Sequence, residues 1–246
     1  MFQPGWEASA HFMAGRVRQP EPMRRSWQSP QGADVSGGPF QNTYYPAALQ
    51  NAPPQLIRKE RDISIKPWIC RGSKTIIKDR WINLHADDCE LPDGTKISPF
   101  YVNTIPDFVV TVAITTEGEF IFVRQYRHGT RQILLELPAG CMEASDADPK
   151  AGAARELLEE TGYAGNEPVF LCKVAPNASS LSNFAHCYLI TGCRKVREQH
   201  LDSTEDIEVV VLSAEETQQL LKNGGLVQAV HVAAMYYAER LLKKSI

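Results

Sequence analysis

Three glutamates stand close together in the stretch RELLEETG, at Glu156, Glu159 and Glu160. In a helix, side chains three and four residues apart are neighbours, so like charges there repel by roughly 0.2–0.5 kcal/mol per exposed pair. Gly162 is typical of a helix end, which places these acids in the last turn, where they also oppose the helix dipole. A divalent cation reverses both penalties, because Mg²⁺ and Mn²⁺ prefer hard oxygen ligands one turn apart. The stretch therefore indicates either a solvated acidic face or a cation site.

The helix that carries these acids has clear local signals. Asp148 is a plausible N-cap, and Pro149 suits the first helical position, where its missing N–H costs nothing. Arg155 lies four residues before Glu159, so it can reach this glutamate and hold it in place. We expect the charges on one side of the helix and an apolar face on the other, formed by Ala151, Ala154, Leu157 and Leu158.

The segment GCMEASDADPKAGAARELLEETGY, residues 140–163, resembles the Nudix box, G-x5-E-x7-R-E-U-x-E-E-x-G-U, where U is bulky and apolar. From Arg155 onward every specified position matches, with the final tyrosine taken as U. The first half departs from the pattern, because one extra residue separates Gly140 from Arg155. Counting back from Arg155 puts Ala147 at the box glutamate, whereas counting forward from Gly140 puts Asp146 there. Both alignments stay open at the level of the sequence.

The resemblance extends over about residues 60–243. VRQYRHGTRQILLELPAG and TEDIEVVVLSAEE are similar to the ADP-ribose pyrophosphatase branch of the superfamily. This implies attack of water on a nucleoside diphosphate linked to a second moiety, with ADP-ribose giving AMP and ribose 5-phosphate. It further implies a Nudix-type α/β/α sandwich with a mixed β-sheet and N-terminal antiparallel strands. Relatives of this branch are often homodimers, and we expect the segment around Lys66–Ile97 to cross to the partner.

The family reaction depends on a divalent cation, which the resemblance identifies as Mg²⁺, with Mn²⁺ as the alternative. Glu156 and Glu160 are the direct ligands that it implies. Glu159 is either a third ligand or a partner through water. The carbonyl of Ala139, in the tight turn before the helix, completes the predicted shell.

A catalytic base is implied in a loop after the box. Glu205, in DSTEDIEV, fits that place, and Glu198 is the alternative. A solvated loop acid is an equally good interpretation of Glu205, because a base is judged first by its geometry. The predicted catalytic set is therefore Glu205 with Glu159 and Arg155.

Two further groups are candidates for substrate binding. Arg124 and Arg127 suit phosphate or ribose oxygens, since a guanidinium makes bidentate contacts. If residues 120–126 form a strand, Arg124 lies on one of its faces and Arg127 lies past its end. Ser179 and Asn183 belong to a loop of small polar residues, SSLSN, which either lines the pocket or makes ordinary turns.

The remaining pattern predicts a mixed α/β domain. DFVVTVAITTEGEFIFVRQYR is typical of a hairpin, and FVVTVAIT within it suits a buried strand. Further strands are expected in SKTIIKDRWINLHADDCEL, LPDGTKISPFYVNTI, ILLELPAG, EPVFLCKV, AHCYLITGC and IEVVVLS. Two helices follow, over about residues 214–221 and 227–243. The second has helical spacing along an apolar face formed by Val230, Ala233, Ala234, Tyr237 and Leu241.

Composition limits the classes of partner and the domain organisation that this chain can have. A formal net charge of -3 provides no strong positive field that would attract nucleic acid or anionic membranes. The apolar runs are too short to span a bilayer. The scattered cysteines argue against a disulfide framework, so we expect a cytoplasmic protein, with an organelle as a minor alternative. Residues 1–55 hold half of the 16 prolines and are expected to form a flexible tail. Residues 56–246 then form the domain, with N-terminal strands in 56–105 and the catalytic core in 106–246.

Two alternatives to an ADP-ribose pyrophosphatase remain. The substrate is another nucleoside diphosphate sugar, such as GDP-mannose, or the chain is a non-catalytic nucleotide-sugar-binding module on the same fold. Ala147 and the extra loop residue motivate the second alternative. The three retained glutamates favour an enzyme, because a binding module does not need to tolerate their repulsion.

Overall fold

The computed structural model describes residues 65–79 and 82–244. The predicted tail, residues 1–55, lies outside the described residues. The first six described strands are β1 (Ile69–Lys78), β2 (Asn83–Glu90), β3 (Lys96–Asn103), β4 (Phe108–Thr115), β5 (Phe120–Arg127) and β6 (Gln132–Glu136). The next elements are β7 (Ala139–Cys141), α1 (Pro149–Thr161), β8 (Tyr163–Ala164), β9 (Val169–Val174) and β10 (Ala185–Lys195). The chain continues with β11 (Ile207–Leu212), α2 (Ala214–Lys222) and α3 (Ala229–Lys244).

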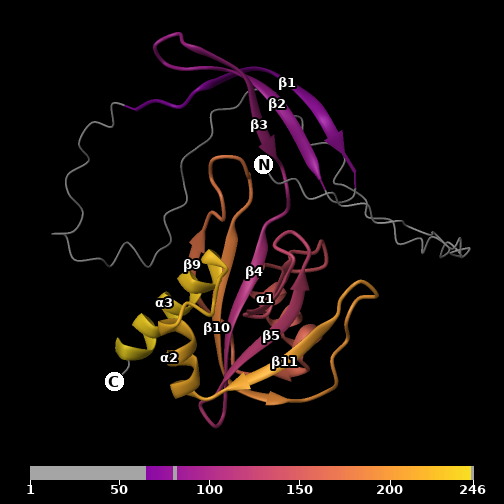
Figure 1. The fold of residues 1–246 in the computed structure, drawn as a ribbon, viewed down its shortest axis with the longest axis vertical. Coiled ribbons are helices and arrows are strands. Elements are labelled where there is room, and N and C mark those ends of the chain that lie inside the picture. The colour runs from indigo at the N-terminus through magenta and orange to yellow at the C-terminus, as the bar shows by residue number, and fades with distance from the viewer. Residues whose placement is uncertain (1–64, 80–81, 245–246) are drawn as a thin grey trace, which may run out of the picture. The chain divides into compact units, whose positions relative to one another are not determined.

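The strands form two sheets (Figure 1). The smaller sheet is antiparallel, in the order β1-β2-β3. The larger has the order β11-β5-β4-β10-β8, with β6 beside β5, β7 beside β4 and β9 beside β10. Strands β4 and β10 pair in parallel while the other pairs are antiparallel, so this sheet is mixed. The predicted mixed sheet and the predicted N-terminal antiparallel strands are both confirmed.

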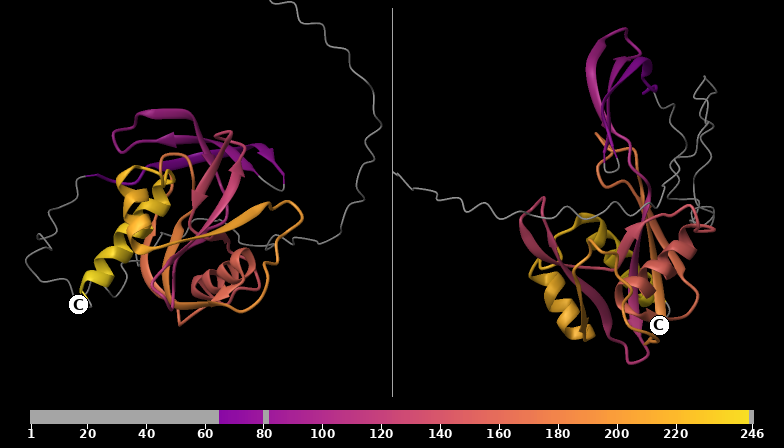
Figure 2. Two further views of the ribbon diagram at one scale, coloured as in Figure 1. Left: turned by 60° about the horizontal axis from the view of Figure 1, so that its bottom comes forward. Right: turned by 90° about the vertical axis from the view of Figure 1, so that its right-hand side faces the viewer.

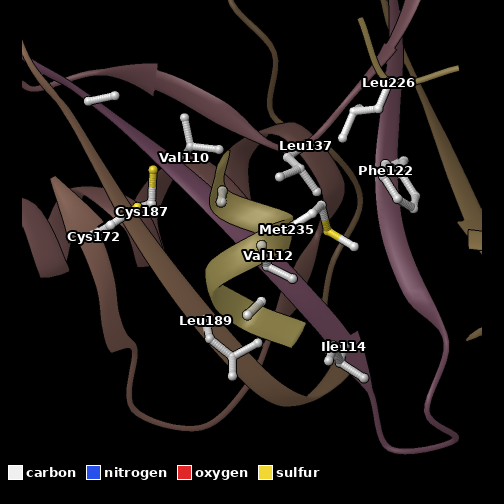
Figure 3. Close-up of a cluster of buried hydrophobic side chains, with 13 residues drawn as sticks. Val110, Val112, Ile114, Phe122, Leu137, Cys172, Cys187, Leu189, Leu226 and Met235 are labelled. Carbon is white, nitrogen blue, oxygen red and sulfur yellow. The ribbon is translucent and has the colours of Figure 1, made fainter. Parts of the chain in front are cut away.

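Helices cover both faces of the larger sheet, with α1 on one side and α2 and α3 on the other (Figure 2). On the α1 side, Leu157 packs with Ala113, Ile121 and Ile190. On the other side, Met235 of α3 lies within a cluster with apolar side chains of β4, β5 and β10 (Figure 3). This burial on both faces explains why the sequence of β4 is a continuous apolar run instead of an alternating one.

The three-stranded sheet has little of this cover within the described residues. Large apolar side chains on it are more than two-fifths exposed, namely Trp68, Ile69, Ile76, Ile77 and Tyr101. Its last strand is joined to the loop before β10, because the N–H of Asn103 donates to the Ser180 carbonyl at 2.8 Å. The N–H of Ser182 donates back to the Asn103 carbonyl at 3.3 Å.

The predicted apolar face of the last helix is partly wrong. Val230, Ala234 and Leu241 pack against the core, but Tyr237 is 44% exposed. The buried stripe instead includes Met235 and Ala238, and a polar side chain, His231, is buried in the first turn of the helix. None of the helices in residues 65–79 and 82–244 is long and apolar enough to cross a membrane.

Candidate functional site

The glutamates of α1 lie on its buried face, contrary to the predicted division into apolar and charged sides. Glu156 and Glu160 are only 9% and 4% exposed, and they share the inner face with Ala153 and Leu157. The predicted apolar residues Ala151 and Ala154 are exposed instead, and Leu158 is half-buried. A solvated acidic face is therefore excluded for Glu156 and Glu160. Periodicity could not show this, because the two carboxylates have the same helical spacing as core residues.

Local signals fixed the ends of α1 as predicted. The Asp148 side chain accepts the N–H of Ala151 at 2.8 Å, and Pro149 occupies the first turn. Gly162 ends the helix in the left-handed conformation, with φ of 75°. A side chain at Gly162 would also collide with the backbone carbonyl of Arg197, so only glycine fits there.

Arg155 connects the acids to the loop before the helix. Its Nη1 donates to Glu156 and to Glu159, each at 2.9 Å, which confirms the predicted contact with Glu159. Its Nε and Nη2 donate to the two oxygens of Asp146 at 2.8 and 2.9 Å. Nη2 also donates to the Cys141 carbonyl at 3.1 Å. One guanidinium thus holds two glutamates and the loop in a single arrangement.

The structure decides between the two alignments of the box loop. The Asp146 side chain is almost fully buried and makes a bidentate ion pair with Arg155, and the Glu143 N–H also donates to it at 2.8 Å. Asp146 therefore supplies the carboxylate that Ala147 lacks. It pairs with the Arg155 guanidinium, and the hydrogen bonds that it accepts lower its pKa.

Two glutamates are held against β7, the short strand that precedes the helix. The prediction of a tight turn at this place was wrong, because Ala139 and Gly140 pair with β4. The Glu160 carboxylate accepts the N–H of Ala139 at 2.9 Å, and the Glu156 carboxylate lies directly over Gly140. Burial raises the pKa of Glu156 to about 7, although the charge of Arg155 opposes the shift. Burial raises the pKa of Glu160 to about 8, although the Ala139 N–H opposes the shift. Two carboxyl groups that titrate near neutrality are thus one helical turn apart.

The loop after β10 closes the C-terminal end of α1. The N–H of His200 donates to the Glu159 carbonyl at 2.9 Å, and the side chain of Gln199 donates to the Glu160 carbonyl at 2.6 Å. Gln199 also donates to the carbonyl of Ile207, the first residue of β11, at 3.0 Å. Carbonyls that a helix end leaves without partners are therefore satisfied by this loop. The same loop carries both candidates for the catalytic base.

Glu205 and Glu198 differ in their surroundings. Glu205 is held in a turn, where its carboxylate accepts the N–H of Asp202 at 2.9 Å. Its charge contributes to the raised pKa of both Glu156 and Glu160, after burial and nearer groups, so Glu205 lies within electrostatic reach of the site. Glu198 is exposed and forms an ion pair with Lys195 at 2.9 Å. The geometry therefore favours Glu205, while its role stays a prediction.

The two candidate arginines of β5 lie on opposite faces of the sheet. Arg127 is the last residue of the strand, so the prediction that it lies past the end was wrong. It shares the side of Ile121, which packs with α1, whereas Arg124 shares the side of Phe122, which packs with α3. The charges of Glu160 and Glu205 both act on Arg127, after its direct partner Glu136. Arg124 pairs instead with Glu208 of β11 at 2.9 Å.

Loop SSLSN makes turn contacts. The Ser179 hydroxyl donates to the Asn177 side chain at 2.6 Å. Asn183 is buried, and its Nδ2 donates to the Pro106 carbonyl at 3.1 Å. These contacts hold the loop in place, and a part of Ser179 and Asn183 in substrate binding stays a prediction.

Three polar residues at the site were missed by sequence reasoning. Glu136 is fully buried and accepts two hydrogen bonds from Arg127, at 2.8 and 2.6 Å. Burial by itself would raise the pKa of Glu136, but Arg127 lowers it below the ordinary value. Gln199 and His231 contact the site from 39 and 94 residues away in the chain. Single acids and amides in such segments carry no local pattern that predicts a partner so distant.

The donor set fits a hard divalent cation in type and charge. Glu160 is buried and, within the described residues, has no ion-pair partner, which leaves its negative charge without a direct counterion. In residues 65–79 and 82–244, no group of three or more acidic, histidine or cysteine side chains is already arranged around a cation position. Instead, Arg155 and the Ala139 N–H each donate to oxygens of these glutamates.

Comparisons with known proteins identify two matching family models. The model described as the NUDIX domain matches residues 106–232. The model described as the nucleoside diphosphate sugar hydrolase N-terminal domain matches residues 68–103, which include β1, β2 and β3.

Two curated relatives match most of their own length. The methanol dehydrogenase activator of Bacillus methanolicus is 31% identical over 168 residues, which are 68% of this chain and 90% of that protein. The ADP-ribose pyrophosphatase of Bacillus subtilis (strain 168) is 30% identical over 172 residues, 68% of this chain and 92% of that protein. A crystal structure described as ADP compounds hydrolase has a TM-score of 0.66 and 22% identity, covering 74% of this chain and 97% of that one. At that identity the likeness shows the fold.

Replacing Gly140 with alanine tests whether Glu156 needs its place over β7. The added Cβ would lie well inside contact distance of the Glu156 carboxylate and displace it. We expect the affinity for Mg²⁺, measured by calorimetry, to fall by about 10- to 100-fold. Gly129→Ala is the control, because a Cβ there meets open space and its φ is not positive. Equal Mg²⁺ affinity in the two variants would contradict the prediction.

The raised carboxyl pKa values predict how stability depends on pH. The native state binds protons on Glu156 and Glu160 more tightly than the unfolded chain does, so their contribution to stability is complete below pH 4.5 and is lost as pH rises through 7 to 8. The difference in melting temperature between the parent and Glu160→Gln should therefore shift in favour of the variant between pH 5 and 9. Saturating Mg²⁺ should reduce this shift, because it stabilises the parent more than the variant, which has lost one ligand. A difference that stays constant with pH would show that Glu160 titrates normally.

Proposed function

Because this chain belongs to the NUDIX family, we propose that it hydrolyses the diphosphate of a nucleoside diphosphate sugar, with ADP-ribose as substrate. The products are AMP and ribose 5-phosphate. The observation that carries the proposal is the pair of buried glutamates, Glu156 and Glu160, held by Arg155 and by the Ala139 N–H of β7. The match of residues 68–103 to an N-terminal domain of nucleoside diphosphate sugar hydrolases supports the substrate class.

We assign the cation site to Glu156, Glu159 and Glu160, with the Ala139 carbonyl as a further ligand, and we propose Mg²⁺, with Mn²⁺ as the alternative. When bound, such an ion neutralises diphosphate charge and lowers the pKa of a coordinated water. Arg155 orients the carboxylates of Glu156 and Glu159, because Asp146 holds its guanidinium in place.

The reaction adds water across the P–O–P bridge. Glu205 accepts a proton from the attacking water, whose oxygen forms a bond to one phosphorus. The bond from that phosphorus to the bridging oxygen breaks, and the second phosphate leaves with the bridging oxygen. Arg127 is on the α1 face of the sheet and suits a phosphate oxygen, whereas Arg124 lies on the opposite face and is bound to Glu208. Gln199 keeps the loop of Glu205 fixed to the end of α1.

The structure weakens the case for a non-catalytic module. That alternative rested on the missing box glutamate at Ala147, and the neighbouring Asp146 supplies a buried carboxylate that pairs with Arg155. The relative named as an ADP-ribose pyrophosphatase supports an adenine nucleotide over GDP-mannose. We also propose a cytoplasmic homodimer. The exposed apolar residues of the three-stranded sheet support an interface with a second copy.

A substrate panel tests the proposal. The purified chain is incubated with ADP-ribose, other ADP-sugars and GDP-mannose in Mg²⁺, and nucleoside monophosphate is measured. We expect AMP from ADP-ribose, at a rate that falls by at least about tenfold in Glu160→Gln, because a cation ligand is lost. Binding of ADP-ribose without turnover would support the non-catalytic module and overturn the proposed hydrolysis.

The assignment of the base has a matched pair of variants. Glu205→Gln should lower kcat by about 10²- to 10⁴-fold and flatten the acidic limb of the pH–rate profile, because the proton acceptor is removed. Glu198→Gln lies in the same loop but is paired with Lys195 at the surface, so its kcat should match the parent. The reverse result would transfer the role to Glu198.

A further inference from the structure

His231 is a buried side chain that the proposed reaction does not use. It lies in the first turn of α3 and is 2% exposed. Its Nδ1 accepts the backbone N–H of Leu137 at 3.1 Å. An acceptor at Nδ1 places the ring proton of the neutral imidazole on Nε2. The contact joins α3 to the segment just before the candidate cation site.

Four polar groups of the segment from Glu136 to Ala139 have identified partners. Glu136 accepts two hydrogen bonds from Arg127, the proposed phosphate ligand. The Pro138 carbonyl accepts the N–H of Thr111 at 2.9 Å. The Ala139 N–H donates to Glu160. Among the backbone groups named here, the Leu137 N–H differs because its partner is a side chain of α3, His231.

Burial keeps His231 in the form that accepts this hydrogen bond. It lowers the pKa of His231 to about 4, with the charge of Glu136 opposing the shift and that of Arg127 adding to it. A neutral ring is therefore present throughout the range in which Glu156 and Glu160 titrate. Glu136 connects β5 with the start of α3. It accepts hydrogen bonds from Arg127 of β5 and from the side chain of Gln228, just before α3, and it interacts electrostatically with His231.

We propose that His231 is a positioning residue, which fixes the Leu137 amide and thereby sets both the Arg127–Glu136 pair and the Ala139–Glu160 contact. Without its acceptor, the buried Leu137 N–H turns to find another partner. Ala139, the first residue of β7, is two residues away, so its N–H and carbonyl shift relative to Glu160. The inference rests on the proposed function, because it assigns His231 a task at that site.

A histidine that only fills the core would behave differently. Its replacement by any side chain of similar volume would preserve the site, and its loss would lower stability alone. A positioning role depends on one acceptor atom instead. Asparagine places an amide oxygen close to the location of Nδ1, whereas leucine fills the volume without an acceptor, and glutamine carries its oxygen one bond farther out.

The test compares His231→Asn, His231→Leu and His231→Gln in the full chain. Three quantities are measured, namely Mg²⁺ affinity by calorimetry, kcat and KM with ADP-ribose, and hydrogen exchange at Leu137. We expect His231→Leu and His231→Gln to lose about 10- to 100-fold in Mg²⁺ affinity and kcat, with faster exchange at Leu137. His231→Asn should recover most of this loss. Should the leucine variant fail to fold, the glutamine and asparagine variants supply the same comparison.

Ala238→Gly is the control for packing of α3, since Ala238 is buried in the same helix and glycine weakens helices. It should lower the melting temperature and leave Mg²⁺ affinity and kcat unchanged. Equal affinity and kcat in the asparagine, glutamine and leucine variants, with an active parent, would overturn the role of His231. A parent that binds Mg²⁺ but hydrolyses no nucleotide sugar would overturn the proposed substrate, while the comparison of Mg²⁺ affinities would still decide the inference.

Discussion

The constraint on which this structure depends is the burial of two carboxylates, Glu156 and Glu160, one turn apart on the inner face of one helix. Burial disfavours their charged forms and raises the pKa of both toward neutrality. A fold selected for stability alone would place apolar side chains at these positions. Arg155 and the Ala139 N–H reduce the cost, but neither supplies enough positive charge for the pair together with Glu159. The unmet negative charge is what suits the site to a divalent cation.

The surrounding elements hold this arrangement from three sides. The loop before α1 contributes Asp146, which fixes Arg155. The loop after β10 contributes Gln199, which ties the end of α1 to β11 and keeps Glu205 near the acids. The third side is β7, where Gly140 leaves room for a carboxylate that any larger residue would displace. Each contact is made by a buried or half-buried polar group with a defined partner, which is the condition under which such groups specify one geometry.

Local rules were sufficient for much of the fold. Turn chemistry and apolar runs predict the caps at Asp148 and Gly162 and the hairpin of β4 and β5. They also predict most of the order of helices and strands along the chain. The inward direction of Glu156 was not predictable, because helical spacing alone does not say which stripe meets the sheet. The position of Arg127 depended on where β5 ends, which is set by its pairing with β6. Partners such as Gln199 lie far along the chain, and only the fold brings them to the helix.

The central claim is that a divalent cation binds between Glu156 and Glu160 and replaces their protons. A crystal grown at pH 8 and soaked in Mn²⁺ tests it most directly, through the anomalous difference density. The account predicts a peak coordinated by both carboxylates beside the Ala139 carbonyl, and no peak there in Glu160→Gln. Density that appears only at other acids, or that persists unchanged in the variant, would contradict it.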